Sequence, residues 1–174
     1  MREDRLFVNL YAQSEATVAV KGVPVKLAQR TDYPWDGAIK LSVSPEKATK
    51  FEVAVRIPGW VVGHPVPSDL YTYENARPSA WSVRVNGEEV KAPTVNGYFI
   101  LGREWKTGDV VTLDLPTDIH HVAGHAKIAA TRGRVALERG PVVYCLEKVE
   151  ILNAWMGVGA VQENNSVLTS AAAV

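Results

Sequence analysis

Residues 51–60 read Phe-Glu-Val-Ala-Val-Arg-Ile-Pro-Gly-Trp, and this stretch decides the fold. Apolar side chains hold every odd position from 51 to 57, while Glu52 and Arg56 stand between them. Successive side chains on a strand point to opposite faces, so this period of two predicts a strand that buries one face only. Pro58 and Gly59 then predict the end of that strand.

The same alternation recurs along the chain between turn residues. Residues 39–43 and 111–115 repeat it, and Asn-Gly pairs stand at 86–87 and 96–97. Asn-Gly between alternating runs is the strongest short-range signal of a hairpin. Many short strands separated by turns are typical of a sandwich or barrel. We therefore predict an all-β fold, an antiparallel β-sandwich of jelly-roll-like or immunoglobulin-like type, with little or no helix.

The length of 174 residues suits one domain. A chain of this size buries about 70% of the surface that it exposes when unfolded. We expect the sandwich to span residues 1–147, and residues 148–174 to add at most one strand before a frayed end. Residues 61–79 interrupt the alternation with three prolines and predict a long surface loop, a kind of segment that is often functional.

The charge balance excludes several classes of partner. Nineteen basic residues match nineteen acidic ones, so no excess of positive charge is available for a nucleic-acid backbone or an anionic membrane. Residues 1–5 are charged and lack the apolar core of a secretory signal, and no stretch approaches the roughly 20 apolar residues that span a bilayer. We predict a soluble protein that binds neither nucleic acid nor membrane, and its compartment stays open.

Three histidines stand close together in the sequence. On a strand, His121 and His125 share a face and His120 points away, so two of them at most could bind one metal ion. Zinc sites use three or four protein ligands. Cys145 is a possible third ligand, but its position in an apolar run predicts a buried small hydrophobic residue instead. We predict a polar strand edge at the histidines, no metal and no cofactor.

Carboxylates and nucleophiles are also poorly placed for catalysis. A glycosidase needs two carboxyl groups about 5–10 Å apart across the scissile bond. Acidic residues gather here in or beside predicted turns, where charge is usual, namely Glu3, Asp4, Glu88, Glu89, Glu104 and Asp109. The chain contains no Gly-x-Ser-x-Gly motif, no P-loop and no dinucleotide fingerprint. We predict no catalytic residue in this chain.

Aromatic residues at predicted loops and strand ends leave two interpretations open. Sugar rings stack on exposed aromatic faces while carboxylates bond their hydroxyls, so Tyr33, Trp35 and Asp36 could form a carbohydrate platform. Alternatively, aromatic side chains at strand ends close the sandwich or dock on another domain. For that docking surface the candidates are Trp60, Tyr71 and Tyr73, together with Trp35 and the 61–79 loop.

Six segments in register carry a family resemblance. They resemble, in this order, the C-terminal β region of bacterial family 127 glycoside hydrolases, which are of the β-L-arabinofuranosidase type. The segments are 6–18 (LFVNLYAQSEATV), 31–43 (TDYPWDGAIKLSV), 51–60 (FEVAVRIPGW), 83–90 (VRVNGEEV), 97–116 (GYFILGREWKTGDVVTLDLP) and 133–147 (GRVALERGPVVYCLE). The stretch around His120 and the tail after Glu147 depart from the family pattern.

The resemblance implies that catalysis lies elsewhere. In that family an upstream helical toroid holds a cysteine nucleophile, a zinc ion bound by cysteines and a glutamate, and a glutamate acid/base. No such residue carries over here, because Cys145 matches a strand position of the β region. The resemblance implies a non-catalytic accessory domain that packs against and supports the helical catalytic domain. A module that binds a plant-type carbohydrate is the alternative, and an independent hydrolase is the third hypothesis.

Overall fold

The computed structural model describes residues 5–74 and 80–145, which form short strands and two single turns of 3-10 helix. Within this part of the chain, no helix has the length and apolar character needed to cross a membrane. The elements are β1 (Arg5–Val8), β2 (Ser14–Val20), β3 (Val23–Thr31), β4 (Ala38–Pro45), β5 (Thr49–Arg56), η1 (Gly59–Val62), β6 (Tyr71–Tyr73), β7 (Ser82–Val85), β8 (Glu88–Glu89), β9 (Thr94–Val95), β10 (Tyr98–Trp105), β11 (Asp109–Asp114), β12 (Ile119–Gly124), η2 (Ala129–Thr131), β13 (Val135–Arg139) and β14 (Val142–Tyr144).

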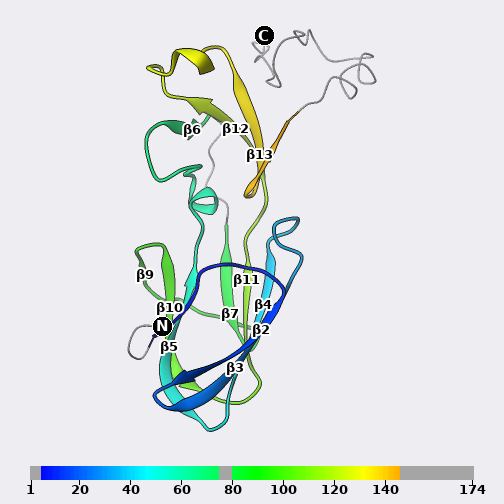
Figure 1. Ribbon diagram of the computed structural model, residues 1–174, viewed down its shortest axis with the longest axis vertical. Helices are drawn as coiled ribbons and strands as arrows, with labels where there is room; N and C mark the ends of the chain where they lie inside the picture. The colour runs from blue at the N-terminus through cyan, green and yellow to red at the C-terminus, as the bar shows by residue number, and fades with distance from the viewer. Residues whose placement is uncertain (1–4, 75–79, 146–174) are drawn as a thin grey trace.

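Two sheets form a sandwich (Figure 1). One sheet has the strand order β1-β5-β10-β9, and the other has the order β2-β3-β4-β11-β7-β8. Their inner faces share one core, in which Val53 and Leu101 of the first sheet cluster with Leu41 and Val111 of the second. This arrangement confirms the predicted all-β sandwich. The pairing is antiparallel except between β1 and β5, which run parallel.

Strand β5 has the orientation that its alternation predicts. Phe51, Val53 and Val55 are buried in the core and the side chain of Arg56 is exposed, but Ala54, on the same face as Arg56, is also buried, so this face is not open along its whole length. Strand β10 pairs along the whole length of β5, with Tyr98 opposite Arg56 at one end and Trp105 opposite Thr49 at the other. The Asn86-Gly87 and Asn96-Gly97 pairs form the predicted turns, and both asparagines have the positive φ that such turns require.

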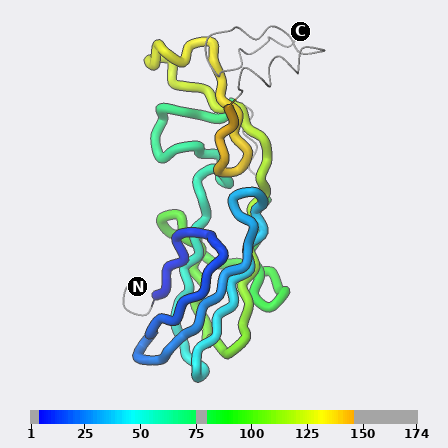
Figure 2. Tube along the Cα trace, turned by 45° about the vertical axis from the view of Figure 1, so that its right-hand side comes forward, coloured from blue at the N-terminus to red at the C-terminus, as the bar shows by residue number. Residues whose placement is uncertain are grey.

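A third sheet lies at one end of the sandwich along the long axis of the molecule (Figures 1 and 2). It is antiparallel and has the strand order β14-β13-β12-β6. Residues 61–79 were expected to form a loop without strands, but they contain part of η1 and the three-residue strand β6. Strand β6 is too short to produce a periodic signal, and it exists because β12 pairs with it. The expected domain boundary at 147 and the tail lie outside the described residues, so both stay predictions.

Glycine is required where the loop before β4 meets the end of β11. Gly37 accepts a hydrogen bond from the backbone N–H of Leu115 at 3.0 Å. A Cβ atom at position 37 would stand 1.6 Å from the carbonyl oxygen of Leu115. A second close approach lies at the β13–β14 turn, where a Cβ at Gly140 would lie 2.9 Å from the Thr117 side chain in the link between β11 and β12. This contact holds the turn of the third sheet against the link that leads to it from the sandwich.

Candidate functional site

An open groove lies at this junction, with a volume of about 560 Å³. Segments that are distant in sequence form it: the loop after β1, the loop after β3, the end of β5 with η1, the loop around residues 64–68, and the β13–β14 turn. Prolines supply much of its wall, at positions 58, 65, 67 and 141. We call it the junction groove; the lining residues that matter below are Leu10, Tyr11, Tyr33, Arg56, Trp60 and His64.

Three aromatic residues line the junction groove. The rings of Tyr11 and Tyr33 meet edge to face, with centroids 5.8 Å apart. Tyr11 and Trp60 are only 6% and 7% exposed, so little of their ring faces is available to a ligand. The Tyr11 hydroxyl donates a hydrogen bond to the backbone carbonyl of Arg56. Only Tyr33, which is partly buried, offers ring surface to the groove.

The junction groove is lined by basic side chains and by no acidic ones. Its lining includes Arg56 and His64 but no aspartate or glutamate. Burial raises the pKa of the Tyr11 hydroxyl, and Tyr33 raises it further, while Arg56 opposes the shift. Burial also raises the pKa of Tyr33, against the lowering effects of Trp60 and Arg56. Both phenols are therefore neutral at pH 7, and Arg56 supplies a permanent positive charge that no lining acid balances.

The predicted carbohydrate platform is divided in the structure. Tyr33 lines the junction groove, whereas Trp35 and Asp36 do not. Trp35 is 66% exposed, and its backbone carbonyl accepts a hydrogen bond from Arg139 at 3.2 Å. The Asp36 carboxylate accepts a hydrogen bond from the Ala38 backbone N–H at 2.9 Å, as in a local turn. A sugar-binding role for these residues stays a prediction.

The predicted docking residues occupy two regions. Trp60 lies with Tyr33 in the junction groove, while Tyr71 and Tyr73 belong to β6 of the third sheet. Tyr73 is buried and donates a hydrogen bond from its hydroxyl to Glu138 at 2.8 Å. Its ring stacks on His120, with centroids 4.3 Å apart. The hydrogen bond and the ring stacking of Tyr73 are thus internal to the third sheet, and its buried ring also belongs to the core cluster that contains Trp60 and Val61. The docking role of all three residues stays a prediction.

The histidine stretch does not form the polar strand edge that we expected. Strand β12 lies inside the third sheet, between β13 and β6, and His120 is buried opposite Glu138. Burial raises the pKa of Glu138, while Tyr73 and His120 act in the opposite direction. The expectation was wrong because strand neighbours from distant segments bury this position. Within residues 5–74 and 80–145, no three His, Cys, Asp or Glu side chains are grouped to hold a metal ion.

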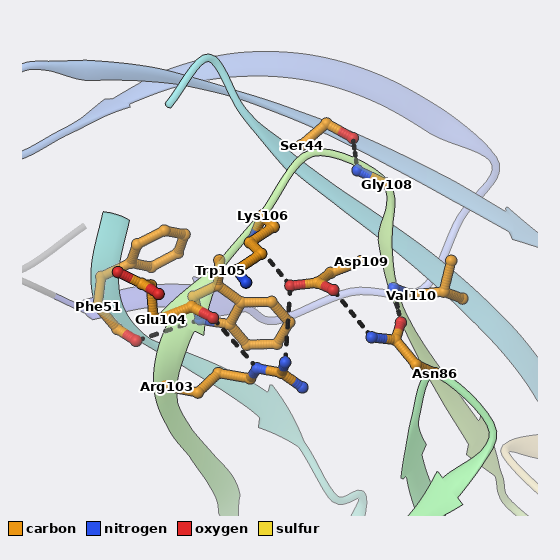
Figure 3. Close-up of polar contacts among 10 residues, drawn as sticks. All are labelled: Ser44, Phe51, Asn86, Arg103, Glu104, Trp105, Lys106, Gly108, Asp109 and Val110. Atoms are coloured by element: carbon orange, nitrogen blue, oxygen red, sulfur yellow. Dashed lines mark hydrogen bonds and ion pairs between the residues drawn. The ribbon is translucent and has the colours of Figure 1, made fainter. Parts of the chain in front are cut away.

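Asp109 is the buried carboxylate of the sandwich, at 8% exposed (Figure 3). It accepts hydrogen bonds at 2.8 Å from the Asn86 side chain and from the Lys106 backbone N–H, and Arg103 lies 3.9 Å away. Burial would raise its pKa, but the bonds from Asn86 and Lys106, with the charge of Arg103, hold that pKa below its ordinary value. These contacts join two turns, which makes Asp109 a structural residue.

Replacing Asp109 with asparagine should lower the free energy of unfolding by about 1–3 kcal/mol at pH 7, because the amide N–H₂ would face one of the two donors, the Lys106 N–H or the Asn86 side-chain N–H₂. The native pKa is depressed, so ionised Asp109 stabilises the fold above its unfolded pKa of about 3.9. This stabilisation disappears as the pH falls through the native pKa. The difference between wild type and Asp109→Asn, measured by urea unfolding, should therefore shrink below about pH 4.

Asp114, at an exposed position of the same strand, provides the matched control. Asp114→Asn should change the free energy of unfolding at pH 7 by less than about 0.5 kcal/mol. Equal losses for the two variants would show that the contacts of Asp109 contribute nothing special to stability.

The other predicted acids and the cysteine also have defined places. Glu88 and Glu89 are exposed on β8, Glu104 is exposed on β10, and Glu3 and Asp4 lie outside the described residues. Cys145 was expected to be a buried hydrophobic residue, but the structure exposes it. The reason is that β14 ends at Tyr144 and is an edge strand, and no other strand among residues 5–74 and 80–145 covers residue 145.

Sequence reasoning missed Arg56 and Leu10 as members of a site. Arg56 occupies an outward position of an alternating strand, which is where a solvated charge is expected. Leu10 lies in the mostly apolar run of residues 6–11, where burial is expected, yet it is 80% exposed in the loop after β1. Only the fold brings both residues beside Tyr33 and Trp60, so no local pattern could have identified them.

Comparisons with known proteins agree with this architecture. A family model described as "Beta-L-arabinofuranosidase, GH127 middle domain" matches residues 5–117. A second, described as "Glycoside hydrolase family 127 C-terminal domain", matches residues 119–173. The expectation that the stretch around His120 and the tail after Glu147 depart from the family pattern was therefore wrong. The boundary between the two falls in the link between β11 of the sandwich and β12 of the third sheet.

Individual relatives are much longer than this chain. It is 31% identical over 127 residues to a non-reducing end β-L-arabinofuranosidase of Bifidobacterium longum subsp. longum, covering 70% of this chain and 17% of the relative. A solved GH127 β-arabinofuranosidase has 39% identity and a TM-score of 0.83, covering 86% of this chain and 24% of that one. A GH127 β-L-arabinofuranosidase from Geobacillus stearothermophilus T6 has 38% identity and a TM-score of 0.73, covering 86% and 21%.

Proposed function

The chain belongs to glycoside hydrolase family 127, as the six sequence segments predicted, and from this membership we propose that it is the non-catalytic β region of a larger hydrolase. It packs against the helical catalytic domain of that enzyme and supports it. The chain spans 17–24% of the length of the relatives described above, which leaves room for a separate catalytic domain. Within its described residues, the acids are exposed or used by the fold.

The observation that carries this proposal is the exposed apolar surface at the junction groove. Leu10 is 80% exposed at a groove whose walls are rich in proline. Leu10, Val66 and the prolines lie together in the lining of this groove, and a contiguous apolar surface of this kind is typical of a site that a partner or ligand covers. Contacts of this kind between domains of one enzyme would hold the sandwich and the third sheet in a fixed position on the catalytic domain.

The experiment compares the β region in two contexts, the 174-residue chain alone and the intact hydrolase, by differential scanning calorimetry. Docking should raise the melting temperature of the β region in the intact enzyme. Leu10→Asp should not change the melting temperature of the isolated 174-residue chain, because the side chain is 80% exposed there. In the intact enzyme the same change should lower the β-region transition by about 4 °C or more.

Two results would contradict the proposal. The first is a β region that melts at the same temperature with and without the helical domain. The second is hydrolysis of a nitrophenyl arabinofuranoside by the 174-residue chain on its own. Lys40→Asp, at an exposed position of β4 in the other sheet, is the matched control. It should leave the melting temperature of the β region unchanged both in the isolated chain and in the intact hydrolase.

A carbohydrate-binding module is the second candidate, and the 66% exposure of Trp35 beside Tyr33 and Asp36 favours it. Stacking of a sugar on this indole would change its fluorescence. Titration of the chain with arabinose-containing oligosaccharides should then shift the emission in wild type and not in Trp35→Ala. An unchanged emission at millimolar sugar would retire this candidate.

A further inference from the structure

We propose that Arg56 is the charged anchor of the docking surface, and that its guanidinium receives a carboxylate from an acidic segment of the catalytic domain seated in the junction groove. This inference rests on the proposed function and names the chemistry of the partner. The junction groove offers the Arg56 cation and no acid to neutralise it. Among the described residues, Arg56 makes no hydrogen bond or ion pair through its side chain, in contrast to Arg5, which pairs with Glu52 on the same sheet.

The backbone of Arg56 is held rigidly from two sides. Strand β10 pairs with it through Tyr98, and the Tyr11 hydroxyl donates a hydrogen bond to its carbonyl. The next residue, Ile57, donates its N–H to the carbonyl of Gly97 at 2.8 Å. The fixed backbone sets the point at the groove from which the Arg56 side chain extends, so binding requires no ordering of the main chain there.

The chemistry of the lining identifies the ligand group. The planar guanidinium presents paired N–H donors whose spacing matches the two oxygens of a carboxylate. Proline rings and Leu10 surround this position with apolar surface. A partner that covers them would exclude water from the ion pair and strengthen it. The complement of this groove is therefore an acidic side chain flanked by apolar residues.

A protein segment fits the junction groove better than a sugar does. The faces of Tyr11 and Trp60 are buried, so the groove provides few aromatic rings for a sugar to stack on. Leu10, by contrast, adds exposed aliphatic surface to the groove, and apolar side chains of a protein segment cover such surface better than the hydroxyl groups of a sugar do. Sugar binding in the groove thus becomes an outcome of the test rather than the proposal.

The test measures melting temperatures of Arg56→Gln in the two contexts described above. In the 174-residue chain the variant should melt within about 1 °C of wild type, because the side chain is exposed and makes no hydrogen bond or ion pair with a described residue. In the intact enzyme its β-region transition should fall by about 4 °C or more, because a partner carboxylate loses its counter-charge. Arg84→Gln, at an exposed position of β7 in the other sheet, is the control and should behave as wild type in both contexts.

A chemical test identifies the carboxylate. In the intact Arg56→Lys enzyme, a carbodiimide should join the introduced amine to an aspartate or glutamate of the helical domain, and mass spectrometry of the peptides locates the bond. Absence of this cross-link overturns the inference.

Other outcomes separate the inference from the proposed function. If wild type shows docking but Arg56→Gln melts like wild type in the intact enzyme, the inference fails and the proposed function stands. If wild type shows no docking, both fail. If galacturonate or arabinose binds the chain at millimolar concentration and Arg56→Gln abolishes this binding, the groove is a sugar site and the inference is overturned.

Discussion

Replacing Gly37 with alanine should prevent stable folding of the chain. The new Cβ atom would lie 1.6 Å from the carbonyl oxygen of Leu115, and this neighbour is backbone, which cannot rotate away. Relief of the clash requires β4 to move away from β11, its partner inside the six-stranded sheet. We expect a loss of about 4 kcal/mol or more, which is a large part of the roughly 5–15 kcal/mol that stabilise a typical domain. Urea unfolding and the yield of soluble protein measure it.

Gly22→Ala separates steric clash from backbone strain. Gly22 has a φ of +75°, and a Cβ atom added there would have no neighbour within 4 Å, so alanine meets strain but no clash. That variant should lose only about 1 kcal/mol. Equal losses at positions 22 and 37 would mean that the approach of Gly37 to Leu115 is not a constraint on the fold.

The strands of the sandwich were predictable because their signals are local. Alternation within residues 51–57 determines which side chains of β5 enter the core, and Asn86-Gly87 sets a turn by its own backbone preferences. Burying one face of each strand then leaves two stacked sheets as the natural arrangement. The parallel pairing of β1 with β5 was not predictable, because no local pattern distinguishes it from an antiparallel pair.

The junction groove was only half predictable. Tyr33 and Trp60 were noticed as aromatic residues at strand ends, and the structure brings both into the groove. Arg56 had the appearance of an ordinary solvated residue, because its role depends on Tyr11 and on the loop around residues 64–68. His120 was misjudged for the same reason, since its burial comes from Tyr73 and Glu138, which are distant in sequence. Contacts between residues that are distant in sequence cannot be predicted from a local sequence pattern.

Replacing Trp105 with alanine should lower the free energy of unfolding by about 3–5 kcal/mol. The indole is fully buried at the end of β10, and its N–H donates a hydrogen bond to the carbonyl of Phe51 at 3.2 Å (Figure 3). Alanine would leave a cavity and would remove the hydrogen bond to the Phe51 carbonyl. Trp35→Ala is the matched control, because that indole is 66% exposed and its removal should cost less than about 0.5 kcal/mol.

The Trp105→Ala variant also distinguishes a loss of stability from a loss of docking. It lies at the end of β10 opposite Thr49, whereas Tyr98, at the other end of the strand, pairs with Arg56 beside the junction groove. Trp105→Ala should therefore destabilise the β region equally in the isolated chain and in the intact hydrolase, whereas a change in the docking surface should act in the intact enzyme only. Urea unfolding in both contexts tests this, and a Trp105→Ala loss confined to the intact enzyme would contradict the division of roles between the core and the groove.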